Sequence, residues 1–194
     1  MLQKYTQPEK WIILGTPFLF IIGSLFHFLY EISGENKIVG ALAPVNESIW
    51  EHLKLVLIPV SCYWILFYLF AGIKTKIEKD KWFTGAIVAL LVALITIPLG
   101  YYFYTGAFGV KLLAVDIALL FLALIFGQGL GLHIYRCFRG VHFTIPIMIT
   151  LCVILLFVMF TFYPPHLPLF RDNVSNQYGI ENKNIARKLN MQGN

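Results

Sequence analysis

Charged residues are scarce in this sequence, at 13% of its 194 residues, whereas 58% of the residues are hydrophobic. Its mean hydropathy of +0.73 is typical of a polytopic membrane protein and excludes an ordinary soluble core. The net charge of +5 comes from Lys and Arg residues in short segments between apolar runs, as in loops beside anionic lipid. No basic aromatic surface is present, so we expect a lipid bilayer and no nucleic acid as partner.

Cysteine and enzyme motifs are scarce as well. Cys62, Cys137 and Cys152 have no CxxC spacing and lie within or at the end of apolar segments, so we interpret them as small packing residues. The sequence lacks an HExxH zinc motif, a phosphate loop, a serine nucleophile elbow and a haem motif. No catalytic class is therefore identified by a local motif.

Long apolar runs are what the sequence has in abundance. A spanning helix needs about 20 mostly apolar residues, and five segments meet this length: 11–30, 49–73, 84–104, 110–138 and 142–163. The fold class predicted is all-α, a transmembrane bundle of five spanning helices. It forms a single domain, 1–172, followed by a polar tail, 173–194.

Prolines and glycines inside these runs predict local features of the bundle. Pro17, Pro59, Pro98 and Pro146 each remove a helical hydrogen bond and predict kinks, above all the one at Pro59. In the fourth run, the GxxxG spacing predicts close helix packing.

The distribution of positive charge predicts the orientation. Two loops rich in Lys and Arg, 74–81 and 136–139, belong in the cytoplasm under the positive-inside rule, as does the amino terminus. Five spans then put the carboxyl terminus outside the cell membrane. The same topology puts two polar clusters, PVNESIWEHLK at 44–54 and PPHLPLFRD at 164–172, at the extracytoplasmic face.

These clusters and two helix ends supply the candidate site. His27 and Glu31 are spaced i and i+4 and share a helix face. Asn46 is the expected N-cap of the second helix, which places Glu47, Glu51 and Lys54 along one stripe with His52 turned aside. Asp116 lies inside the fourth span, where a carboxylate indicates a function or a specific buried partner. His166, Arg171 and Asp172 follow the fifth span in a segment stiffened by prolines.

We assign these residues to one metal-dependent site and keep a structural alternative for each. The metal, zinc or another divalent ion, would be held by His27, Glu31, His52 and His166. The catalytic carboxylates would be Glu47, Glu51 and Asp116. The residues that contact the substrate would be Asn46, Lys54, Arg171 and Asp172. Glu47 or Asp172 is an alternative oxygen ligand. The structural alternatives are helix capping with an intrahelical ion pair, an interfacial His–Glu pair and a tight turn at 164–172.

The two clusters also carry a resemblance. PVNESIWEH, after a helix ending in HFLYE, together with TFYPPHLPLFRDNVSNQYG, resembles a family of small, uncharacterised multi-pass membrane proteins of bacteria. The resemblance spans nearly the whole chain. It implies an integral protein of the bacterial inner membrane and implies no activity, cofactor or catalytic residue.

Three functions from different classes follow from these features. The first is a metal-dependent membrane hydrolase acting on a lipid or envelope precursor. The second is a proton- or cation-coupled transporter or sensor of a small solute, for which Asp116 and the helix-breaking prolines are the main signals. The third is a noncatalytic interaction subunit, whose GxxxG pair would support a homo-oligomer or another helix contact.

Overall fold

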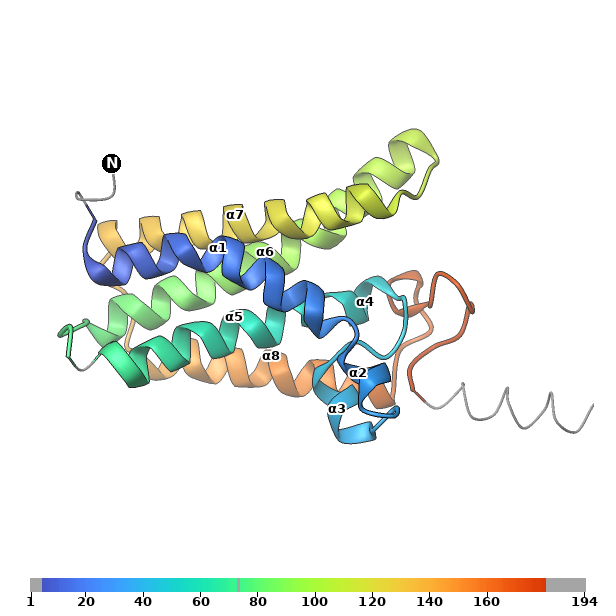
Figure 1. Ribbon diagram of the computed structural model, residues 1–194, viewed down its shortest axis with the longest axis horizontal. Helices are drawn as coiled ribbons and strands as arrows, with labels where there is room; N and C mark the ends of the chain where they lie inside the picture. The colour runs from blue at the N-terminus through green and yellow to red at the C-terminus, as the bar shows by residue number, and fades with distance from the viewer. Residues whose placement is uncertain (1–4, 73, 181–194) are drawn as a thin grey trace, which may run out of the picture.

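The computed structural model describes residues 5–72 and 74–180, which form a bundle of long helices lying side by side (Figure 1). Five helical segments are long and apolar enough to cross a membrane: Gln7–Phe26, Ile49–Gly72, Lys79–Phe108, Leu113–Cys137 and Thr144–Phe162. The prediction of an all-α membrane bundle is therefore confirmed. Residues 181–194 of the predicted tail lie outside the described residues.

The long helices are α1 (Gln7–Phe26), α5 (Lys54–Phe67), α6 (Lys79–Phe108), α7 (Leu113–Cys137) and α8 (Thr144–Phe162). Four short elements belong to the loops around them: α2 (Leu29–Ile32), α3 (Lys37–Leu42), α4 (Ile49–His52) and the 3₁₀-helix η3 (Pro168–Phe170). A π-helical turn, η2 (Tyr68–Gly72), extends α5 and, with α4, completes the second apolar segment.

Apolar side chains cover both the inside and the outside of the bundle. Trp64, Trp82 and Leu124 are among the buried core residues, whereas Phe70 and Phe103 are 76% and 72% exposed. A surface of large exposed apolar side chains fits a hydrocarbon environment. The three cysteines are also exposed and unpaired, so our interpretation of them as packing residues was wrong.

Close backbone contacts hold α6 against α7. A Cβ atom added to Gly127 would lie 2.5 Å from the Ala89 carbonyl oxygen, and one added to Gly131 would lie 2.8 Å from the Gly85 carbonyl oxygen. Only glycine allows such an approach, so the predicted packing role of the GxxxG pair is confirmed.

The Leu55 carbonyl, which Pro59 leaves without a helical donor, lies against a glycine of α1. Pro59 has no N–H to give to the Leu55 carbonyl, four residues earlier. That carbonyl faces Gly23 of α1, where an added Cβ would lie 2.7 Å from the oxygen. The proline therefore affects how α1 and α5 pack.

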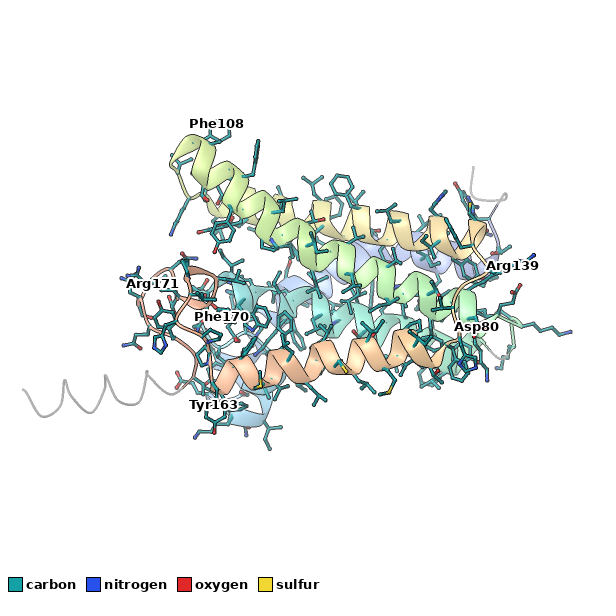
Figure 2. All side chains as sticks on the ribbon, turned by 180° about the vertical axis from the view of Figure 1, so that it is seen from behind. Asp80, Phe108, Arg139, Tyr163, Phe170 and Arg171 are labelled. Carbon is teal, nitrogen blue, oxygen red and sulfur yellow. The ribbon has the colours of Figure 1, made fainter. Side chains whose placement is uncertain are left out.

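The two ends of the bundle differ. Phe108, Arg171 and Tyr163 lie at one end, and Asp80 and Arg139 lie at the other (Figure 2). The α6–α7 hairpin extends past its neighbours at the first end and turns at Gly109, whose φ of +67° suits glycine. We call this first end, which also carries α2, α3 and α4, the site end.

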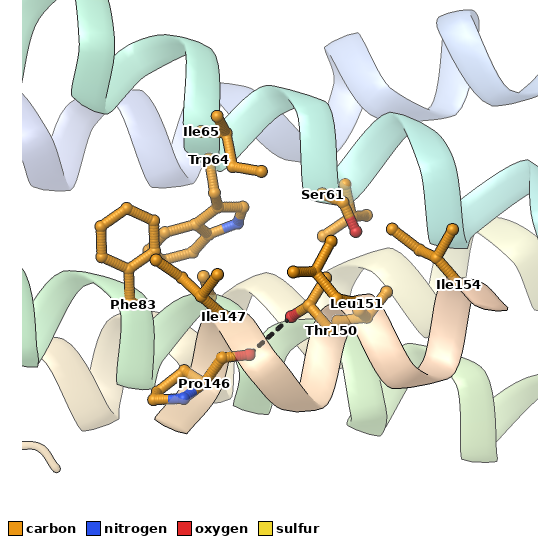
Figure 3. Close-up of a pocket in the computed structure, with 12 residues that line it drawn as sticks. Ser61, Trp64, Ile65, Phe83, Pro146, Ile147, Thr150, Leu151 and Ile154 are labelled. Atoms are coloured by element: carbon orange, nitrogen blue, oxygen red, sulfur yellow. Dashed lines mark hydrogen bonds between the residues drawn. The ribbon is translucent and has the colours of Figure 1, made fainter. Parts of the chain in front are cut away.

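A small cavity of about 70 Å³ lies between α5, α6 and α8 (Figure 3). Its lining is mostly apolar and includes no titratable side chain. The Thr150 hydroxyl in its wall donates to the Pro146 carbonyl at 2.9 Å, while the buried Ser61 Oγ and Trp64 Nε1 have no hydrogen-bond partner among the described residues. The cavity therefore offers no titratable group for catalysis or metal binding.

Candidate metal centre

Three of the predicted site residues converge at the site end. The carboxylate of Glu47 lies between two imidazole rings, with Oε1 3.6 Å from His27 Nε2 and Oε2 3.4 Å from His52 Nε2. One ligand atom from each residue can be chosen so that all three lie within 4.8 Å of one another. A tetrahedral zinc ion with bonds near 2.05 Å requires ligand separations of about 3.3 Å, so small side-chain movements would suffice.

Each of these residues stands at the boundary of a helix. His27 is the C-cap of α1 and His52 is the last residue of α4. Glu47 precedes α4, whose N-cap is Ser48, because the Ser48 hydroxyl accepts from the Glu51 N–H at 3.2 Å. Our prediction of Asn46 as the N-cap was wrong. The Asn46 side chain instead accepts from the Ser48 N–H at 2.9 Å, which fixes the turn before the helix.

The hydrogen bond made by His52 determines what its other nitrogen can do. His52 Nδ1 lies 2.9 Å from the Ser48 carbonyl oxygen, which can only accept, so we assign the ring hydrogen to Nδ1. In a neutral ring, Nε2 then presents a lone pair to the Glu47 carboxylate. Two acceptors facing each other at 3.4 Å require a positive charge, either a second proton on His52 or a bound cation.

The pKa values of His27 and Glu47 are both lowered from their ordinary values. Burial, followed by the charge of His52, lowers the pKa of His27, although Glu47 and Glu31 act in the opposite direction. The interaction with the His52 ring holds the pKa of Glu47 below its ordinary value, in spite of burial and the nearby Asp172 carboxylate. Neutral imidazole and ionised carboxylate are the forms that bind metals.

The cluster is open on one side. The side chains of His27, Glu47 and His52 are 30%, 47% and 31% exposed, so a fourth ligand or a substrate has access. Apolar side chains of the adjoining α1–α2 segment are exposed nearby in the sequence, including Phe28 and Ile32. The centre therefore combines three nitrogen and oxygen donors with an accessible position at the end of the spanning segments.

Glu51 and Lys54 take no part in this cluster. They form a buried ion pair of 2.8 Å, and Lys54 Nζ also donates to the carbonyls of Gly40 and Ala43 at 2.8 and 3.2 Å. The predicted stripe of Glu47, Glu51 and Lys54 is not observed, because Glu47 lies before the helix begins. The ion pair at i, i+3 agrees with the structural alternative, and its contacts with the end of α3 were not predicted.

The remaining predicted residues are not part of the cluster. Asp116 accepts from the Tyr104 hydroxyl at 2.7 Å and lies close enough for its charge to act on His52. His166 is exposed, and its ring lies 4.7 Å from that of Tyr178. Glu31 and Arg171 are exposed as well. Glu31 does not share one continuous helix with His27, since α1 ends at Phe26 and α2 begins at Leu29.

Asp172 and Asn173, which follow the last spanning helix, form hydrogen bonds with the backbone of Glu47. The Glu47 N–H donates to Asp172 Oδ2 at 3.4 Å, and Asn173 Nδ2 donates to the Glu47 carbonyl at 3.0 Å. Backbone N–H groups of Ser175 and Val174 outweigh the effect of burial and lower the pKa of Asp172. Asn173 was not among the predicted site residues, although its neighbour Asp172 was.

Comparisons with known proteins agree with the resemblance noted in the sequence. A family model described as a family of unknown function, DUF6512, matches residues 1–180. No curated protein and no solved structure matches the chain.

Proposed function

Because the chain belongs to this family of unknown function, we propose its function from the site itself: a membrane protein that binds a divalent metal, zinc first, through His27, Glu47 and His52. The observation that carries the proposal is the position of the Glu47 carboxylate between two ring nitrogens. On His52, the hydrogen bond to Ser48 directs the Nε2 lone pair at this carboxylate. Two histidines and one glutamate, with a further position left accessible, are the ligand set of several catalytic zinc sites.

We further propose that the centre is hydrolytic and acts on a lipid or an envelope precursor at the extracytoplasmic face. A bound zinc would supply Lewis-acid activation of water or of an ester or phosphate oxygen. Asp116, whose charge reaches His52, is our candidate for the carboxylate that accepts a proton. The apolar side chains near the cluster would hold the acyl part of the substrate.

Metal analysis of the purified chain tests the proposal. Protein prepared in mild detergent without chelators should contain close to one zinc per chain, and both His52→Ala and Glu47→Gln should lose it. His133→Ala is the matched control, since His133 is a histidine of the opposite end of the bundle and belongs to no metal-ligand group among the described residues. Wild-type protein that binds no zinc after incubation with the metal would contradict the proposal, as would equal metal content in wild type and His52→Ala.

A second candidate, proton- or cation-coupled transport, rests on Asp116. This carboxylate lies within a spanning helix, and its oxygen is hydrogen-bonded to the Tyr104 hydroxyl. Intramembrane carboxylates are common in proton pathways. If the chain is a carrier, Asp116→Asn in proteoliposomes should abolish pH-driven uptake while metal content stays the same. Metal-dependent hydrolysis without any coupled flux would decide against it.

A further inference from the structure

The geometry points to Asp172 and Asn173 as positioning residues that hold the Glu47 backbone so that its carboxylate reaches both histidines. This inference rests on the proposed metal-binding function. Both backbone polar groups of Glu47 are engaged, since its N–H donates to Asp172 Oδ2 and its carbonyl accepts from Asn173 Nδ2. Two consecutive side chains from position 172 thus fix a residue more than a hundred positions earlier in the chain.

Glu47 needs such support because regular secondary structure does not supply it. It lies in the turn before α4, outside the helical hydrogen-bond pattern, and its side chain is 47% exposed. An unsupported backbone there would let the carboxylate move toward solvent and away from His27 and His52. Contacts from outside the ligand set are known to orient the ligands of metal centres.

The segment that carries Asp172 and Asn173 is itself preorganised. Asp172 Oδ1 accepts from the N–H groups of Val174 and Ser175 at 2.7 and 3.0 Å, and the Asp172 N–H donates to the Gln177 carbonyl at 2.8 Å. Asp172 therefore shapes a tight turn with one oxygen and holds Glu47 with the other. Both oxygens of the Asp172 carboxylate are therefore used, and the residue is buried, with a relative exposure of 4%.

Asn173 also connects the turn to the α6–α7 hairpin. Its Oδ1 accepts from Lys111 Nζ at 2.8 Å and lies 3.5 Å from the Tyr101 hydroxyl, while its Nδ2 donates to Glu47. The amide needs both its acceptor and its donor for these contacts. An alanine at this position would lose both contacts without adding a charge near the cluster.

The experiment measures zinc affinity by competition with a chromophoric chelator, using the full chain in detergent. Asn173→Ala should weaken zinc binding by about 10- to 100-fold, the range found for second-layer residues of metal centres, with little change in the unfolding midpoint of the metal-free protein. Asp172→Asn, which retains an acceptor for the turn but loses the one facing Glu47, is the second variant. Val174→Ala is the matched control, because Val174 lies in the same turn and is 77% exposed.

A spectroscopic readout separates positioning from general stability. Cobalt(II) bound to the wild type should give visible d–d bands whose intensity reports the coordination geometry, and Asn173→Ala should change them while Val174→Ala should not. Unchanged affinity and spectra in both Asp172→Asn and Asn173→Ala would overturn the positioning role while leaving the metal site intact. Failure of the metal site itself would be recognised separately, because the wild type would then bind neither zinc nor cobalt, and the inference would fall with it.

Discussion

Replacing Lys54 by methionine should destabilise the fold strongly, because the ammonium group it removes is fully used. The Lys54 side chain is 1% exposed and lies 2.8 Å from Glu51 Oε2. Its other two hydrogens go to the carbonyls of Gly40 and Ala43. The variant would leave a buried carboxylate without its counter-charge and two carbonyls without their donor.

Breaking a buried ion pair by removing one partner costs about 3–5 kcal/mol. Glu51 keeps two weaker partners in the variant, since its oxygens also accept from the Val45 N–H at 3.1 Å and the Thr161 hydroxyl at 3.2 Å. We therefore expect a loss of about 3 kcal/mol for Lys54→Met, at the lower end of that range. Adding Glu51→Gln to Lys54→Met should recover part of the lost stability, because the second substitution removes the uncompensated charge.

The assay is reversible unfolding in mixed micelles, followed by far-ultraviolet circular dichroism, from which the free energy of unfolding is obtained. Lys81→Met is the matched control, because Lys81 pairs with Glu78 at the same i, i+3 spacing and at 2.9 Å, but with side chains 29% and 67% exposed. An exposed pair contributes at most about 1 kcal/mol. A loss for Lys54→Met no larger than that for Lys81→Met would refute the assignment of Lys54 and Glu51 to a stabilising buried pair.

Two further predictions concern helix packing and capping. Gly127→Ala should lower the free energy of unfolding by about 1–3 kcal/mol through overpacking against the Ala89 carbonyl. In the same unfolding assay, Gly129→Ala should be neutral or slightly stabilising, because no atom lies within 4 Å of the added Cβ. Ser48→Ala removes the acceptor of the Glu51 N–H and should cost about 1 kcal/mol of stability, measured by thermal unfolding; no change would show that the cap contributes nothing.

Hydropathy identified the spanning segments because burial in lipid demands long apolar runs, but it did not identify where each helix ends. Apolar residues mark 84–104, whereas α6 continues from Lys79 to Phe108. Backbone hydrogen bonding continues through polar residues, and the helix stops at Gly109, which adopts a left-handed conformation. At the end of α1 the sequence HFLYE contains neither glycine nor proline, so the break after Phe26 had no local signal.

The sequence predicted that polar residues gather at one end of the bundle, but it predicted less well which of their side chains lie close together. His27 and His52 were expected near each other because both lie at helix ends on the same side of the bundle. The separation of Glu47 from Glu51 depends on the helix beginning after Ser48, a difference of two residues from the expected Asn46 cap. The contact of Asn173 with Glu47 joins positions 126 residues apart, and no local spacing indicates it.

The contrast between Glu47 and Glu51 indicates which carboxylate is available for function. Glu51 is saturated, since a lysine, a hydroxyl and a backbone N–H occupy its oxygens, and its charge is cancelled by Lys54. Within the described part of the chain, the side-chain partners of the Glu47 oxygens are two ring nitrogens, one of which presents a lone pair when its ring is neutral. The carboxylates of Asp172 and Asp116 add negative charge close to this centre. This arrangement supports our proposal of a divalent cation rather than a single proton, because one proton on His52 would neutralise only part of the negative charge.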